Sequence, residues 1–235
     1  MQAPRLRVGV LGEDPEGHRL GRSLAEVGHT VDMLEDPEAA ADLELVIVSA
    51  SAADLPALVE QLSARARRGQ IYLHTCLALG VQVFDPLEPS GAVVVAAHPL
   101  SKRLWAVGAA DELGETIVEL LVGELGGNAL VVSETQRARL AAGMTYAGFI
   151  ETVRKDAVTL LAEALGNVDH AQEIVDSPGT RRALGPVAGP GGVVDQQKAI
   201  EDPGLARAFR ELARRTAELT RVDDVELWAI QEERP

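Results

Sequence analysis

The feature that most constrains the fold is a regular alternation of short apolar runs with helical segments over the first 132 residues. The runs have the length of buried β-strands, and the segments between them repeat apolar residues at helical spacing. Strands that alternate with helices form a mostly parallel sheet with right-handed crossovers. The sequence therefore predicts an α/β fold with a doubly wound sheet. The expected strands are residues 5–12, 30–35, 45–50, 70–76, 92–97, 104–109 and 129–132.

The pattern changes at Ser133, where Ser133-Glu-Thr-Gln136 has the spacing of a capping box. A helical pattern without proline runs from there to Leu165 and is far longer than any earlier one. We therefore divide the chain into a Rossmann-type cofactor-binding domain, residues 1–132, and an all-helical domain, residues 133–235.

Further helices are expected in the second domain at about 169–175 and 204–220. The Gly- and Pro-rich stretch 177–192 is expected to be an irregular loop. For the acidic tail, 222–235, the sequence leaves a strand, an arm and a disordered segment open.

Composition excludes several classes of protein. The chain of 235 residues has 36 acidic and 22 basic residues and a net charge of −14, which disfavours nucleic-acid binding. No apolar run has the length of a membrane span, and no signal peptide is evident. The one cysteine, Cys76, cannot form an internal disulfide, which fits a cytoplasmic protein.

The turn after the first strand contains the glycines expected where a dinucleotide pyrophosphate meets a helix N-terminus. Gly12, Gly17 and Gly21 are spaced as a degenerate glycine motif, with His18 among them. The same stretch carries Glu13, Asp14 and Glu16, which would repel phosphate. It is either a nucleotide site or a decayed, repurposed loop.

Two acids, Glu35 and Asp36, end the second strand. An acid at this point usually binds a ribose 2′-hydroxyl and disfavours the 2′-phosphate of NADP. Glu35 has the better spacing from Gly21. If a nicotinamide cofactor binds, the sequence favours NAD over NADP. The alternative is two solvated acids at the start of the next helix.

Polar residues follow the third, fourth and fifth strands, where ligands collect in open α/β sheets. They are Ser49, His74, Thr75, Cys76 and His98. We expect cofactor contacts from Ser49, Thr75 and Cys76, and acid or base catalysis by His98 or His74. The alternative is a buried thiol with histidines that bind loop carbonyls.

These residues carry a resemblance to the 6-phosphogluconate-dehydrogenase-like reductases. His74-Thr-Cys-Leu-Ala-Leu-Gly80 and His98-Pro-Leu100 are similar to segments of Rossmann-like proteins related to ketopantoate and pyrroline-carboxylate reductases. Gly185-Pro-Val187 also resembles the helical domain of that group. The resemblance implies an oxidoreductase that transfers a hydride between NAD or NADP and a small-molecule substrate. It also implies a homodimer formed through the helical domain, with Leu140, Met144 and Phe149 as candidate contacts.

A second resemblance gives the thiol another role. The iron-dependent, hydrogen-forming methylenetetrahydromethanopterin dehydrogenase has a similar His-Ala-Cys-Thr segment and a Tyr-Ala-Gly segment like Tyr146-Ala-Gly148. This likeness implies that Cys76 ligates the iron of a guanylylpyridinol cofactor, with His18 or His98 near the reacting hydrogen. A third alternative is a non-catalytic ligand-binding protein on a decayed dehydrogenase scaffold.

Overall fold

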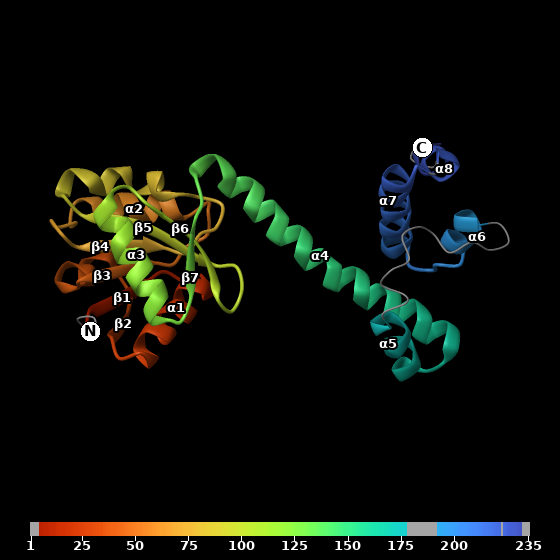
Figure 1. Ribbon diagram of the computed structural model, residues 1–235, viewed down its shortest axis with the longest axis horizontal. Helices are drawn as coiled ribbons and strands as arrows, with labels where there is room; N and C mark the ends of the chain where they lie inside the picture. The colour runs from red at the N-terminus through yellow and green to blue at the C-terminus, as the bar shows by residue number, and fades with distance from the viewer. Residues whose placement is uncertain (1–4, 178–191, 222, 232–235) are drawn as a thin grey trace. The chain divides into compact units, whose positions relative to one another are not determined.

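The computed structural model describes residues 5–177, 192–221 and 223–231 of the chain. Strands and helical segments alternate up to β7 except between β5 and β6, and the elements after β7 are helical (Figure 1). The first half contains β1 (Arg7–Leu11), α1 (Pro15–Glu26), β2 (Thr30–Leu34), η1 (Pro37–Asp42), β3 (Leu45–Val48), α2 (Leu55–Ser63), β4 (Ile71–His74), η2 (Val81–Ser90), β5 (Val93–Pro99), β6 (Leu104–Ala109), α3 (Glu112–Glu124) and β7 (Asn128–Val131). The second half contains α4 (Glu134–Leu165), α5 (Val168–Asp176), α6 (Gly192–Lys198), α7 (Pro203–Thr220) and α8 (Asp223–Gln231).

The strands form one sheet in the order β2-β1-β3-β4-β5-β6-β7. All neighbours are parallel except β5 and β6, which are antiparallel. The link between β5 and β6 is too short for a crossover, so these two strands pair as a hairpin. The predicted mostly parallel, doubly wound sheet is confirmed. Parallel pairing brings the carboxyl ends of β1, β3, β4 and β5 to one edge, which we call the carboxyl edge.

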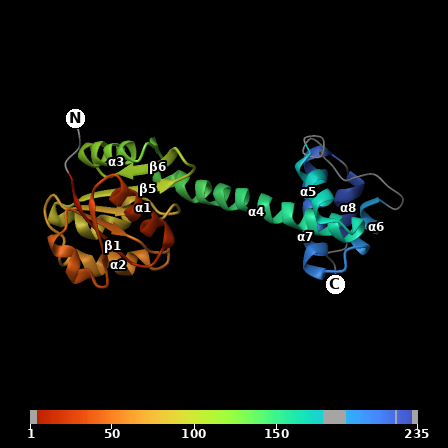
Figure 2. The same ribbon diagram turned by 90° about the horizontal axis from the view of Figure 1, so that it is seen from below.

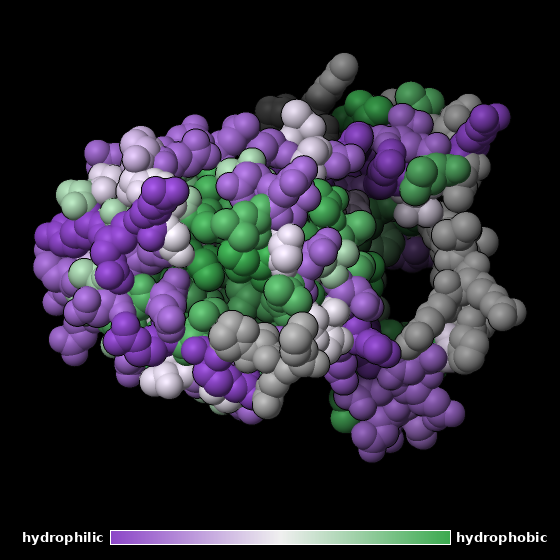
Figure 3. Space-filling model, turned by 60° about the vertical axis from the view of Figure 1, so that its left-hand side comes forward, coloured by the Kyte–Doolittle hydropathy of each residue, from purple (hydrophilic) through white to green (hydrophobic). Residues whose placement is uncertain are grey.

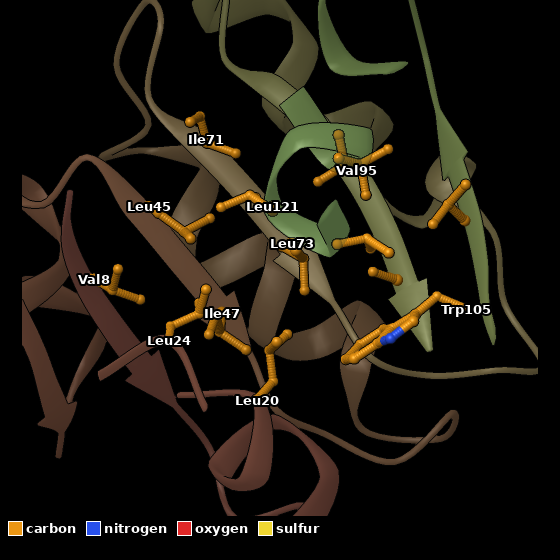
Figure 4. Close-up of a cluster of buried hydrophobic side chains, with 14 of the residues drawn as sticks. Val8, Leu20, Leu24, Leu45, Ile47, Ile71, Leu73, Val95, Trp105 and Leu121 are labelled. Atoms are coloured by element: carbon orange, nitrogen blue, oxygen red, sulfur yellow. The ribbon is translucent and has the colours of Figure 1, made fainter. Parts of the chain in front are cut away.

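Both faces of the sheet are covered (Figure 2). On one face Leu20 and Leu24 of α1 and Leu121 of α3 pack against alternate strand residues (Figure 4). On the other face α2 and the two 3-10 segments, η1 and η2, pack against the remaining strand residues. Strands covered on both sides read as continuous apolar runs, which is why the sequence located them.

The turn after β1 is shorter than the sequence suggested. Helix α1 begins at Pro15, so Gly17 lies inside its first turn and not in a loop. Gly12 has φ +101°, and a Cβ there would lie 2.2 Å from the Ser49 carbonyl oxygen. A Cβ on Gly17 would lie 2.3 Å from Ser49 Oγ, and one on Gly21 would lie 2.7 Å from Val10 Cγ2. The three glycines therefore allow the turn and α1 to lie against β1 and β3.

At the opposite edge of the sheet, the buried His29 joins three parts of the first half of the chain. Its Nδ1 accepts a hydrogen bond from the Leu6 backbone N–H (3.1 Å). Its Nε2 must then carry the proton, and it donates to the Glu124 carboxylate at the end of α3 (2.8 Å). The imidazole thus links the start of β1, the end of α1 and the end of α3.

The chain divides into two compact units, residues 1–146 and 147–235, and the division falls within α4. In the second unit, Arg154 of α4 forms a two-oxygen ion pair with Asp176 at the end of α5. The described residues of the tail form the helix α8, which excludes the strand that the sequence left open for them. Most of the loop expected at 177–192 lies outside the described residues.

Hydrophobic side chains also reach the surface, where they form an area bordered by hydrophilic residues in the view of Figure 3. In the first unit the exposed large hydrophobic residues include Leu113, Leu120, Leu130 and Val131. Among the helices of the described residues, none combines the length and the apolar character that crossing a membrane requires.

The contact between α1 and β3 can be tested with a matched pair of substitutions. Gly17→Ala places a methyl group against Ser49, and we expect this overpacking to lower the free energy of unfolding by about 1–2 kcal/mol. Gly123→Ala in α3 meets nothing within 4 Å, so its better helix propensity should raise the same quantity by up to about 1 kcal/mol. Urea unfolding of both variants measures the difference. Equal effects would contradict the role given to Gly17.

Candidate functional site

The first part of the candidate site is the turn between β1 and α1. His18 Nε2 donates to the Gly12 carbonyl oxygen (2.7 Å). The buried Ser49 hydroxyl donates to the Asp14 carbonyl oxygen, and the Asp14 N–H donates to the Ser49 carbonyl oxygen (3.1 Å). Ser49 and His18 therefore hold the turn against the end of β3.

The N-terminus of α1 is already occupied by the chain's own carboxylate. Asp14 Oδ1 accepts a hydrogen bond from the Glu16 N–H (2.9 Å), and Pro15 at the first helical position has no N–H. The exposed Glu13 carboxylate and the half-buried Glu16 carboxylate add further negative charge. A dinucleotide pyrophosphate needs free N–H groups and a positive field here. These residues therefore make the turn a weak site for a pyrophosphate held in this way.

The acids after β2 have different roles. Asp36 caps η1 by accepting the Ala39 N–H (3.0 Å). Glu35 is exposed and forms no hydrogen bond or ion pair within the described part of the chain. Its carboxylate is therefore available to a ribose diol.

A pocket of about 510 Å³ opens at the point where strand order reverses, between the ends of β1 and β3, and is lined by Gly12, Asp14 and Ser49 among others.

The second part of the site lies at the ends of β4 and β5. His98 Nδ1 is 2.6 Å from the Thr75 carbonyl oxygen. Because a carbonyl can only accept, Nδ1 carries the proton, and in the neutral ring Nε2 keeps a free lone pair. His98 is half-buried, so this nitrogen is an oriented base at the carboxyl edge. The contact joins the carboxyl ends of the neighbouring strands β4 and β5, and it is a bond to a loop carbonyl, as the alternative interpretation of the sequence expects.

His74 is placed for a different role from His98. It is fully buried and packs against the Phe84 ring, with 5.2 Å between ring centroids. Its Nε2 donates to the Gly80 carbonyl oxygen (3.0 Å). Burial is the main cause that lowers its pKa to about 4. His74 is thus a neutral side chain that fixes the loop after β4.

Cys76 follows Thr75 and is half-buried, with a free thiol against the apolar layer under η2. The described residues contain no group of three or more His, Cys, Asp or Glu side chains that could hold a metal ion. The thiol lies at the carboxyl edge, next to the Thr75–His98 contact. An iron site at Cys76 receives no support.

The structure adds Arg137, in the first turns of α4, which the sequence did not single out. Its side chain is 1% exposed, and Nε, Nη1 and Nη2 have no hydrogen-bond partner within the described part of the chain. Burial lowers the pKa of this guanidinium, while Glu134 and Cys76 raise it. The sequence does not show which of Arg137 and Arg139 is buried. The direction in which the first turns of α4 leave the sheet buries Arg137 and exposes Arg139.

Comparisons with known proteins agree with this architecture. Residues 31–99 match the Rossmann-like domain model, and residues 133–232 match the model of the 6-phosphogluconate dehydrogenase C-terminal domain-like family. The two models match successive parts of the chain. The resemblance drawn from the motifs after β4 and β5 is confirmed at this level. No curated protein sequence matches the chain.

Solved structures of oxidoreductases share the fold over nearly the whole chain. A Bacteroides fragilis protein assigned as an NADP oxidoreductase has a TM-score of 0.67 and 14% identity, covering 91% of this chain and 98% of its own. A Plasmodium falciparum pyrroline carboxylate reductase with NADP bound has a TM-score of 0.57 and 12% identity, covering 96% of each chain. A Mycobacterium tuberculosis 3-hydroxyisobutyrate dehydrogenase with L-serine has a TM-score of 0.52 and 17% identity, covering 92% and 88%. At these identities the likeness establishes the fold alone.

The buried, neutral His74 should make stability depend on pH. The unfolded imidazole protonates near its ordinary pKa of about 6.5, whereas the folded one protonates only near 4, so the unfolded state binds more protons between these values. Stability is then lost as pH falls. From pH 7 to pH 5, we expect His74 to contribute a decrease of about 2 kcal/mol in the free energy of unfolding.

Urea unfolding at both pH values measures this decrease, with His74→Gln as the comparison. Glutamine retains a donor for the Gly80 carbonyl but does not titrate. The variant should lose about 2 kcal/mol less than the wild type between the two pH values. The same pH dependence in both proteins would show that His74 is not the group responsible.

Proposed function

We propose that the chain is an oxidoreductase that acts on a small molecule with a nicotinamide dinucleotide, preferring NAD to NADP. The observation that carries this proposal is the oriented His98 ring, whose Nε2 is free at the carboxyl edge of a Rossmann-like sheet. A histidine ring that is held by one nitrogen and has the other nitrogen free is able to give or take a proton. The similar solved structures, which include an NADP-bound reductase, support the reaction class.

His98 is assigned as the acid or base, and His74 as the residue that positions the loop beside it. Thr75 and Cys76 are proposed to contact the ligand at the ends of β4 and β5. At the other end of the site, Glu35 is proposed to bind the ribose hydroxyls and to repel a 2′-phosphate. Residues 1–132 would bind the cofactor.

The acidic turn before α1 sets a limit on this function. Because the pyrophosphate would meet Asp14 and Glu13 in place of free N–H groups, binding should be weak. Asp14→Ser removes one charge and keeps a side chain that caps helices well. We expect it to tighten NADH binding by about fivefold, which corresponds to about 1 kcal/mol of relieved repulsion. Fluorescence titration with NADH and NADPH measures both affinities.

Asp111→Ser is the matched control, because Asp111 caps α3 in the same way but lies after β6, away from the carboxyl edge. It should leave NADH binding unchanged, since its charge is distant and screened. NADH should bind more tightly than NADPH in the wild type, and Glu35→Ala should reduce that preference. If neither cofactor binds at millimolar concentration to the wild type or to Asp14→Ser, the proposed function is wrong.

The same turn favours a second candidate, a ligand-binding protein without catalysis on a dehydrogenase scaffold. Its specific support is the Asp14 cap, which fills the anion position of α1 with the chain's own carboxylate. Turnover of any substrate with NADH or NADPH that is lost in His98→Ala would exclude this candidate. Small-molecule binding that is indifferent to both cofactors would favour it.

We also propose a homodimer formed through α4. This helix has 32 residues, all of them described, and its one buried side chain is Arg137. Met144, Phe149 and Ile150 are exposed. A helix of this length gains most of its stability by burying an apolar face, so a second copy is the expected partner.

Size-exclusion chromatography with light scattering should give twice the mass of the chain at micromolar concentration. Met144→Glu, which puts a charge into the proposed interface, should give the monomer mass, whereas Glu163→Gln on the same helix should not. A monomeric wild type would contradict the dimer.

A further inference from the structure

The start of α4 packs directly onto the loop that follows β4. Gly80, at the end of this loop, is buried, and the three atoms nearest to a Cβ built on it all belong to the Glu134 carboxyl group. They lie closer than a side chain tolerates. The Gly80 backbone has φ −105° and ψ −166°, an extended conformation that any residue adopts. Glycine is therefore required here by Glu134, the first residue of α4, and not by the backbone conformation.

Arg137 holds Glu134 in this place. The two side chains are three residues apart, so they are neighbours on the surface of the helix. The buried Arg137 guanidinium lies against Gly108 of β6, where a Cβ would be 2.7 Å from Nη2. Burial lowers the pKa of this guanidinium and the Glu134 charge raises it, so the carboxylate stabilises the buried cation. The first turn of α4 is thereby held with the Glu134 carboxylate against Gly80.

Two histidine hydrogen bonds connect Gly80 with the ends of β4 and β5. The Gly80 carbonyl oxygen accepts from Nε2 of the buried His74 (3.0 Å). Thr75 follows His74 in the chain, and its carbonyl oxygen accepts from His98 Nδ1 (2.6 Å). If Gly80 moved, His74 would lose its acceptor inside the protein, which is costly. The loop would then have to shift, and the Thr75 carbonyl oxygen would shift with it.

We propose that Gly80 and Glu134 are positioning residues for His98. The first residue of α4 sets the place of the loop after β4, and this loop supplies the Thr75 carbonyl oxygen that keeps the His98 proton on Nδ1. Nε2 is then the nitrogen that gives or takes a proton. The inference rests on the proposed function only in giving His98 the role of acid or base.

The tautomer of His98 reports this positioning without cofactor or substrate. Long-range proton–nitrogen NMR spectra, recorded where the imidazoles are neutral, distinguish the two tautomers. The wild type should show Nδ1–H at His98, and Gly80→Ala should show a mixture, because the methyl group displaces the loop. His98→Gln identifies the signals. His29 is the internal reference, since its Nδ1 accepts from the Leu6 N–H (3.1 Å) and should stay unprotonated in every variant.

Two double variants separate the contact with Glu134 from a general effect of the methyl group. Gly80→Ala/Glu134→Ala makes room for the methyl group and should restore the Nδ1–H tautomer of His98. Gly80→Ala/Glu134→Gln removes the same charge beside Arg137 but keeps the size of the side chain, so it should not restore the tautomer. The thermal midpoint of the first double variant should be higher by about 5 °C, the effect of relieved overpacking.

Three results would overturn the proposal: a wild type without the Nδ1–H tautomer at His98, a folded Gly80→Ala that keeps this tautomer, and equal behaviour of the two double variants. The comparison of the double variants decides the question even where Gly80→Ala alone does not fold. Because the spectra need no cofactor, a failure of NADH binding leaves this result unaffected. An unchanged tautomer would overturn the positioning role and leave the proposed redox function standing.

Discussion

The constraint on which the rest of the structure depends is that the central parallel strands are covered on both faces. Side chains within β1, β3, β4 and β5 are used for packing against α1 and α3 on one side and α2, η1 and η2 on the other. Polar side chains that could bind a ligand or transfer a proton therefore lie where each strand ends. Ser49, Thr75, Cys76 and His98 all occupy such positions on one edge. The site is a consequence of how the core is built.

The same constraint explains how much of the fold could be predicted. The central strands β1, β3, β4 and β5 are covered on both faces and are apolar runs, so they could be located from the sequence. The antiparallel direction of β6 could not, because it depends on the length of the preceding turn. The start of α1 does not follow from the glycine pattern, which extends the turn to Gly21, although Pro15 is well suited to the first position of a helix. The tail could not be assigned, since a short segment takes its structure from its packing partner, which for α8 is α7.

The candidate site was predicted only where strand ends define it. The contact of His98 with Thr75 follows from parallel order, whereas the burial of His74 depends on η2, which packs over it and was not expected. Arg137 enters from a helix that begins beyond the last strand, and sequence spacing alone does not orient it. The acidic residues of the turn after β1 are evident in the sequence, but the structural role of each acid is not. The structure shows one of those acids in use as a helix cap.

The histidine at the far edge of the sheet has a consequence for the order in which the chain becomes ordered. His29 joins the Leu6 backbone to the Glu124 carboxylate, so residues separated by more than half of the first unit share one imidazole. A ribosome releases the beginning of β1 long before the end of α3. The hydrogen bond between His29 and Glu124 therefore cannot form until most of the sheet has been synthesised. The last turn of α3 then joins the amino-terminal edge of the sheet.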